Sequence, residues 1–257
     1  MRKTPAFLKV HCGLVYLFLY LPVLVLVAFS FNDDKRNVVW KGFTLKWYGS
    51  LLDNTELHRA LLNSLKVGLT SSLVATVFAT LAALALTRYR FPGKRAVGTL
   101  IYLPLAIPEI VMGTSLLTFF VGLGVRLSIG TVIAAHIALS IGYATAAIRS
   151  RLAGMDLSVE EAAADLGATP WQVFWLVTFP RILPGVLSGG LLAFTLSFDD
   201  FVVTFFTAGI GSGTLPLEIY SMLKFGVTPE LNAISTLTLA VTLTALLAWE
   251  KLGGSRT

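Results

Sequence analysis

Charged residues are scarce in this sequence. Only 13% of its 257 residues are Asp, Glu, Lys or Arg, while 55% are hydrophobic. An ordinary soluble domain carries roughly 25% charged residues. The composition therefore argues against a soluble globular protein and favours an integral membrane protein. Because the polar inserts between the apolar runs are short, we expect one transmembrane domain over residues 1–257.

Cysteine, histidine and phosphate-binding motifs are also nearly absent. The one cysteine, Cys12, excludes an intrachain disulfide and a cysteine-based metal site. The three histidines are far apart, and His136 is expected to be a packed, hydrogen-bonded residue rather than a ligand. No G-x-x-x-x-G-K-[ST] phosphate loop occurs, and no nucleophile–base pair stands out. We therefore expect a chain that is not an enzyme, holds no metal or cofactor, and relies on a partner subunit to bind ATP.

The apolar residues that are present gather in runs suited to crossing a bilayer. A helix needs about 20 apolar residues to cross roughly 30 Å of hydrocarbon. The first run alternatively resembles a cleaved signal peptide, since Ala28-Phe29-Ser30 is a loose cleavage site, but its length favours an uncleaved anchor. The predicted fold is all-α with six transmembrane helices, at Leu14–Phe31, Leu61–Thr87, Ala96–Val125, Ile129–Ile148, Ile182–Ala208 and Leu231–Trp249.

The basic residues predict an orientation, because Lys and Arg accumulate in short loops on the cytoplasmic side. With both termini inside, twelve basic residues lie in inside segments and seven in outside loops. We therefore expect cytoplasmic N- and C-termini, and the net charge of +6 requires no nucleic-acid partner. The inside residues are Arg2, Lys3, Lys9, Arg88, Arg90, Lys94, Arg95, Arg149, Arg151, Arg181, Lys251 and Arg256, and the outside residues are Lys35, Arg36, Lys41, Lys46, Arg59, Arg126 and Lys224.

The predicted loop between spans four and five, residues 156–180, contains two helix starts. Ser158 with Glu161 three residues later matches a capping box. Gly167 suits a left-handed residue that ends the first helix. Thr169 then caps a second helix that has Pro170 in its first turn. Taken alone, these signals are equally compatible with an ordinary solvent-exposed helical hairpin.

The spacing within this 156–180 loop resembles the EAA loop of ABC-importer permeases. Glu161-Ala162-Ala163, Gly167 and Pro180 match that motif in register, whereas the family's Ile and Leu before the proline are Val177 and Phe179 here. The resemblance implies that the first helix is a coupling helix that docks on an ATPase subunit. It assigns the contact and bend to Glu161, Ala162, Ala163, Asp165 and Gly167.

Three further segments resemble the permeases of spermidine/putrescine importers: residues 42–48, 192–201 and 229–234. The resemblance implies a type I importer permease fold in the bacterial inner membrane, forming half of a pathway for a polyamine or similar organic cation. It also implies a second permease, two ATP-binding subunits and an extracytoplasmic solute-binding protein as partners. Another solute of the same family is an open alternative, and so is an autonomous channel or secondary carrier.

Three acidic residues fall deep within the predicted spans: Glu109, Asp199 and Asp200. A charge at the bilayer centre costs about 2.5–3.5 kcal/mol on insertion scales, so such residues are usually functional or paired. At 1.5 Å per helical residue, Glu109 and Asp199 would lie about 20 and 26 Å from the inner surface, in one layer. Pro104 and Pro108 interrupt the third span just before Glu109, and broken helices are tolerated where they line a cavity. Together the acids suit a cationic solute. Alternatively, either Asp caps a helix or pairs with a partner subunit, and at most one of the two needs to face the pathway.

The remaining candidates for solute contact are Trp47, Tyr48 and Ser197. Trp47 and Tyr48 follow the first outer loop and offer cation–π contacts to an alkylammonium chain. Aromatic residues of the membrane interface are the alternative interpretation. Ser197 lies in the segment of residues 192–201 that carries the family resemblance, and we group it with the predicted binding residues. The sequence does not specify which polyamine or cation is carried.

Overall fold

The computed structural model describes residues 6–35, 38–224 and 226–253. Within these residues the secondary structure is helical, and the only β-type pairing is an isolated bridge between Asn32 and Phe43. Arg2, Lys3, Arg36 and Arg256, which contribute to the predicted orientation, lie outside the described residues. The chain divides into two compact units, Met1–His58 with Ile219–Thr257 and Arg59–Glu218. The single domain expected over residues 1–257 stays a prediction.

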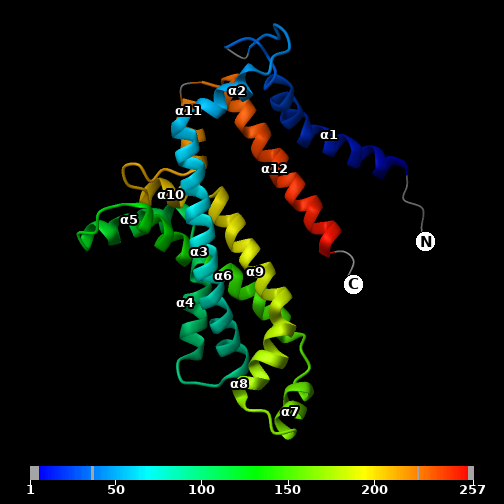
Figure 1. Cartoon of the computed structure of the whole chain (residues 1–257), viewed down its shortest axis with the longest axis vertical. Helices are drawn as coiled ribbons and strands as arrows, with labels where there is room; N and C mark the ends of the chain where they lie inside the picture. Colours follow the sequence, from blue (N-terminus) through cyan, green and yellow to red (C-terminus); the bar gives the residue numbers. More distant parts are fainter. Residues whose placement is uncertain (1–5, 36–37, 225, 254–257) are drawn as a thin grey trace. The chain divides into compact units, whose positions relative to one another are not determined.

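The first unit contains the helices nearest the two ends of the chain (Figure 1): α1 (Ala6–Phe29), α2 (Lys46–Asp53) and α12 (Pro229–Gly253). Helix α12 contacts both α1 and α2. The side chains of α1 are apolar and largely exposed, with Phe18 at 79%. A helix with so much exposed apolar surface needs lipid or another protein around it.

The second unit is a bundle in which α6 packs against α4, α9 and α10 (Figure 1). Its elements are α3 (Thr55–Arg88, from Arg59 on), α4 (Lys94–Ala106), α5 (Glu109–Gly122), α6 (Ile129–Ala153), α7 (Ser158–Asp165), α8 (Pro170–Val173), the π-helical turn η1 (Phe174–Thr178), α9 (Phe179–Asp199), α10 (Val202–Thr207) and the start of α11 (Leu215–Lys224).

Small residues let the helices of this bundle approach closely. A buried cluster joins Ala79 and Ala83 of α3 to Ala144 of α6 and Ala193 of α9. A Cβ atom at Gly142 of α6 would lie 2.7 Å from the carbonyl oxygen of Ile101 on α4. Close backbone approach through Gly and Ala is the usual basis of helix packing in membranes, where lipid tails are as apolar as the side chains.

Four described helical segments are long and apolar enough to cross a membrane, and they fall on the predicted first, second, fourth and fifth spans. The pair α4 and α5 is a fifth candidate, but it is bent by 113° at its break. The predicted sixth span lies in α12, whose side chains are described only as far as residue 244, and it stays a prediction.

The predicted third span, Ala96–Val125, is divided in the structure into α4 and α5, and its crossing of the membrane stays a prediction. Ile107 is extended, with φ −86° and ψ 131°, and Pro108 separates α4 from α5. A residue before proline is driven away from helical backbone angles, and proline has no N–H to continue the helix. The depth of Glu109 calculated along a straight helix is therefore not valid. The fifth span is also interrupted, since α9 ends at Asp199 and α10 starts at Val202.

Candidate functional site

The 156–180 loop folds into the two predicted short helices, with one difference at the first start. Helix α7 begins at Ser158, but Ser158 does not cap it. Instead the backbone N–H and hydroxyl of Ser158 donate to the Asp156 carboxylate at 3.0 and 2.7 Å. These two hydrogen bonds, the backbone one first, hold the pKa of Asp156 below its ordinary value. Asp156 therefore performs the capping role expected of Ser158, because it lies ahead of the first helical residue.

The bend and the second helix start agree with the sequence. Gly167 has a φ of +87°, in the left-handed region that glycine adopts without strain. Thr169 and Gln172 form a reciprocal capping box, and Pro170 occupies the first turn of α8. Of the predicted partner-contact residues, Glu161, Ala162, Asp165 and Gly167 are exposed and Ala163 is half-buried.

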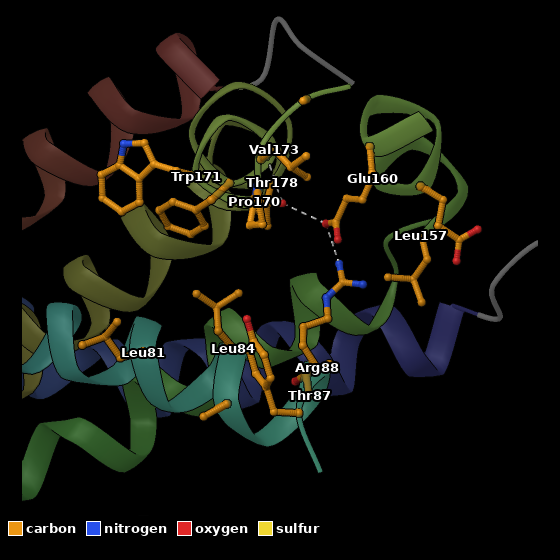
Figure 2. A pocket seen from close by; sticks show the side chains of 16 residues that line it. Leu81, Leu84, Thr87, Arg88, Leu157, Glu160, Pro170, Trp171, Val173 and Thr178 are labelled. Carbon is orange, nitrogen blue, oxygen red and sulfur yellow. Dashed lines mark hydrogen bonds and ion pairs between the residues drawn. The ribbon is translucent and has the colours of Figure 1, made fainter. Parts of the chain in front are cut away.

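An ion pair ties this loop to the end of α3 (Figure 2). Arg88 donates from Nη2 to Glu160 Oε1 at 2.9 Å, and the Thr178 hydroxyl donates to the same oxygen at 3.0 Å. The three residues come from α3, α7 and η1 and border a mainly apolar cavity of about 810 Å³. Glu160 is not among the residues predicted from the sequence. No local signal could have paired it with a residue 72 positions earlier.

The three predicted acidic residues line a second cavity, of about 290 Å³. Glu109 is the first residue of α5, Asp199 is the last of α9, and Asp200 follows it. Leu139 and Tyr143 of α6 complete one wall. Glu109 and Asp199 are exposed, and within the described residues neither forms an ion pair and no Lys or Arg lines the cavity. The site is therefore acidic and open, and no Lys or Arg in the described part of the chain offsets the charge of Glu109 or Asp199.

Asp199 and Asp200 have different environments although they are adjacent. Asp200 is only 8% exposed. Its carboxylate accepts hydrogen bonds from the backbone N–H groups of Val203 at 3.2 Å and Thr204 at 2.8 Å, which start α10. The helix-capping alternative considered for these two acids thus applies to Asp200. Asp199 remains exposed toward the cavity.

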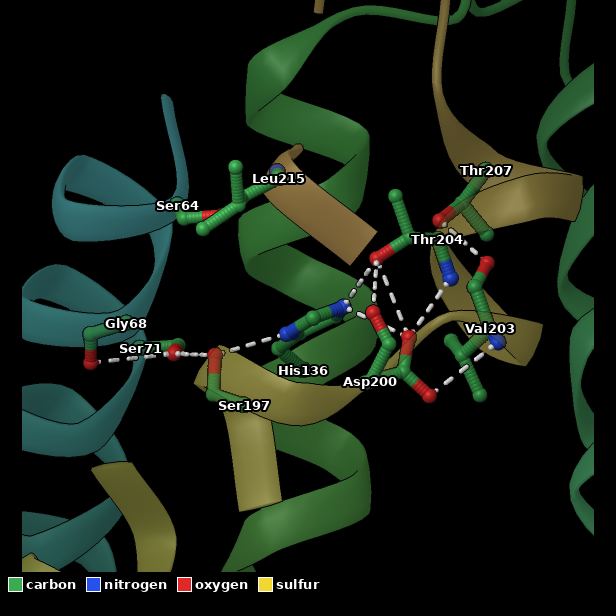
Figure 3. A network of polar contacts seen from close by, with 10 residues as sticks. All are labelled: Ser64, Gly68, Ser71, His136, Ser197, Asp200, Val203, Thr204, Thr207 and Leu215. Carbon is green, nitrogen blue, oxygen red and sulfur yellow. Dashed lines mark hydrogen bonds and ion pairs between the residues drawn. The ribbon is translucent and has the colours of Figure 1, made fainter. Parts of the chain in front are cut away.

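A buried polar network includes Asp200, which also lines the cavity (Figure 3). His136 of α6 is fully buried, and its Nδ1 is 2.7 Å from the Ser197 hydroxyl. Its Nε2 is 2.9 Å from the Thr204 hydroxyl and 3.2 Å from Asp200 Oδ2. Ser197 also bonds to the hydroxyl of Ser71 on α3 at 2.9 Å. His136 is therefore the packed, hydrogen-bonded residue that the sequence led us to expect.

Three predicted binding residues lie elsewhere. Ser197 is 3% exposed and belongs to this buried network, not to the cavity lining. In the first unit, Trp47 Nε1 donates to the Asn32 carbonyl at 2.7 Å, and the Tyr48 hydroxyl lies 2.7 Å from the Ser30 hydroxyl. A cation–π contact does form at Trp47, but with Lys46, whose Nζ is 4.8 Å from the ring centroid. Solute contact by these residues stays a prediction.

Comparison with known sequences gives consistent relatives. Residues 75–249 match the family model of the binding-protein-dependent transport system inner membrane component. The spermidine/putrescine transport system permease protein PotC of Haemophilus influenzae is 42% identical over 229 residues, covering 89% of each chain. The putrescine transport system permease protein PotI of Escherichia coli K12 is 41% identical over 242 residues, covering 91% of this chain and 86% of the relative.

Solved structures show the same fold. A bacterial ABC transporter that imports the acidic polysaccharide alginate matches with a TM-score of 0.77 at 18% identity, covering 98% of this chain and 95% of that one. The MetNI methionine ABC transporter, in an inward-facing conformation, matches with a TM-score of 0.62 at 17% identity, covering 84% and 100%. With the family match over most of the chain, these findings establish that the protein belongs to the inner membrane components of binding-protein-dependent transport systems.

Proposed function

We propose that this chain forms one half of the membrane pathway of an ATP-driven importer for a polyamine or a similar organic cation. The observation that carries the proposal is the acidic cavity, whose described lining includes the exposed residues Glu109 and Asp199 and no lysine or arginine. Relatives about 40% identical that are named as spermidine/putrescine and putrescine permeases support the same class of solute.

The physical argument concerns hydration. A polyamine carries several ammonium groups at neutral pH and loses water when it enters a narrow cavity. Fixed carboxylates replace part of that hydration: at an effective dielectric constant near 20, a unit charge pair at 4 Å is worth about 4 kcal/mol before desolvation is subtracted. Tyr143 and Phe201, which also line the cavity, offer aromatic faces to the methylene and ammonium groups.

Energy for transport would come from separate subunits. We propose that the exposed face of α7, with Glu161, Ala162, Asp165 and the Gly167 bend, docks on an ATP-binding subunit. A second permease would complete the pathway, two ATP-binding subunits would drive it, and an extracytoplasmic binding protein would deliver the solute. This chain itself would hold no cofactor. The alginate transporter, solved with a solute-loaded periplasmic protein, offers a precedent for such an assembly.

Uptake by the assembled transporter tests the proposal. Glu109→Gln and Asp199→Asn keep shape and hydrogen bonding but remove charge, so each should weaken putrescine or spermidine uptake about tenfold at low solute, equivalent to 1.4 kcal/mol. Asp53→Asn, at the exposed end of α2, removes the same charge from a residue that does not line the cavity and is the matched control. Unchanged uptake in both cavity variants would refute the cationic pathway. Uptake by the chain without an ATPase would instead favour an autonomous carrier.

A further inference from the structure

The buried histidine on α6 lies next to the proposed solute site but does not line it. The cavity is bordered by the break between α9 and α10, where Asp199, Asp200 and Phe201 follow one another. Broken helices leave backbone groups unpaired, and in a membrane protein those groups must be satisfied by the surrounding protein. The break therefore needs partners that hold its two ends in a fixed relation.

His136 bridges the two ends of this break. One ring nitrogen contacts Ser197 in the last turn of α9, and the other contacts Thr204 in α10 and the Asp200 carboxylate between them (Figure 3). The imidazole is rigid, fully buried and bonded at both nitrogens, so it fixes the spacing between the end of α9 and the start of α10. The hydroxyl of Thr204 also donates to Asp200 Oδ2 at 3.0 Å, which closes the network.

The far end of α10 is anchored to the same helix. The Thr131 hydroxyl of α6 donates to the Thr207 carbonyl at 2.8 Å. Both ends of the short helix α10 are thus fastened to α6, and Ser71 of α3 fastens the end of α9 through Ser197. With Asp200 turned into this network, the adjacent Asp199 is left at the exposed end of α9.

We propose that His136 is a positioning residue for solute binding, which acts by holding the α9–α10 break so that Asp199 faces the acidic cavity. The inference rests on the proposed function, because it assigns His136 an effect on solute affinity that operates through Asp199. It also assigns Asp200 and Ser197 an indirect role in solute binding, through their hydrogen bonds to His136 at the α9–α10 break. If the role of His136 were purely structural, its substitution would alter the stability of the complex without a specific effect on solute affinity.

A double-mutant cycle separates these two roles. We expect His136→Ala in the assembled transporter to raise the KM of putrescine uptake about fivefold or more, with a smaller change in maximal rate. In an Asp199→Asn background, the same substitution should change KM less than twofold, because there is no longer a charge to position. Ser140→Ala, which truncates a fully buried residue one helical turn further along α6, should leave KM unchanged in either background.

A more conservative variant tests the proposal if the transporter that carries His136→Ala fails to assemble. Thr204→Val keeps the volume and removes the hydroxyl that contacts both His136 and Asp200, and it should show the same dependence on Asp199. The positioning role is refuted if the KM effect of either variant multiplies with that of Asp199→Asn when the two substitutions are combined. It is also refuted if an assembled variant leaves KM unchanged. In both cases the proposed function stands. If Asp199→Asn and Glu109→Gln have no effect, the proposed function and this inference both fail.

Discussion

At the scale of single residues, the adjacent acids Asp199 and Asp200 should respond differently to mutation, because only Asp200 contributes to stability. Asp200→Ala removes a carboxylate that accepts bonds from two backbone N–H groups and from Thr204 in a buried setting. We expect it to lower the free energy of unfolding by about 2 kcal/mol, since a helix cap is lost and buried donors are left unpaired. Asp199→Ala, at an exposed position, should change it by less than about 0.5 kcal/mol.

Thermal unfolding of the purified complex measures this difference, with polyamine uptake recorded in parallel. The expected pattern is a clear drop in melting temperature for Asp200→Ala alone, and reduced low-solute uptake with normal melting for Asp199→Ala. Equal melting temperatures for the two variants would contradict the assignment of Asp200 to the start of α10.

The sequence identifies the acids of the cavity but not their separate roles. Glu109, Asp199 and Asp200 stand out because charge is costly inside an apolar run. Their roles depend on where α9 ends, and a shift of one residue turns a helical side chain by about 100°. His136 and Ser197 could not be paired from sequence, since 61 positions separate them and only the packing of α6 against α9 brings them together.

At the scale of elements, the ion pair between α3 and α7 should transmit force between the bundle and the 156–180 loop. We expect Arg88→Glu and Glu160→Arg each to reduce solute-stimulated ATPase activity severalfold in the assembled complex. Each leaves a half-buried charge facing a like charge, with side chains only 16% and 19% exposed. The combined Arg88→Glu/Glu160→Arg exchange should restore part of the activity. The double-mutant cycle should give a coupling energy of about 1 kcal/mol between the two residues.

Glu161→Lys provides the matched comparison on the same helix. Glu161 is exposed and belongs to the face proposed to dock on the ATPase, so no exchange at Arg88 should rescue it. Basal ATPase activity and co-purification of the subunits confirm assembly. If the exchanged pair behaves no better than the single variants, the ion pair does not couple these elements.

Local sequence signals predict where helices end better than they predict the angles between consecutive helices. Gly167, Thr169 and Pro170 define the bend of the 156–180 loop because their backbone preferences act over a few residues. Pro104 and Pro108 likewise mark an interruption before Glu109, but not the 113° bend between α4 and α5. That angle depends on contacts of α5 with α10, where a Cβ on Gly113 would lie 2.6 Å from the Phe206 ring.

At the scale of the whole molecule, the contact between Arg88 and Glu160 constrains the number of membrane crossings. It brings the end of α3 and the start of α7 together within the second unit. Between them the chain passes through α4, α5 and α6. If α6 crosses the membrane, the α4–α5 pair must cross it too, because an odd number of crossings would leave Arg88 and Glu160 on opposite sides. A re-entrant loop over α4–α5 would break this parity.

We therefore expect the turn between α5 and α6 to lie on the opposite side from the turn between α3 and α4 and from α7. Cys12→Ser gives a chain without cysteine, into which single exposed positions are introduced as Pro92→Cys, Val125→Cys and Leu166→Cys. In intact cells a membrane-impermeant maleimide should label Val125→Cys only. Pro92→Cys and Leu166→Cys should react only after permeabilisation, because Arg88, Arg90, Lys94 and Arg95 favour the cytoplasmic side.

Polyamine uptake by each variant confirms correct folding. Labelling of Val125→Cys only after permeabilisation would mean that α4 and α5 form a re-entrant loop. Labelling of Pro92→Cys in intact cells would reverse the orientation.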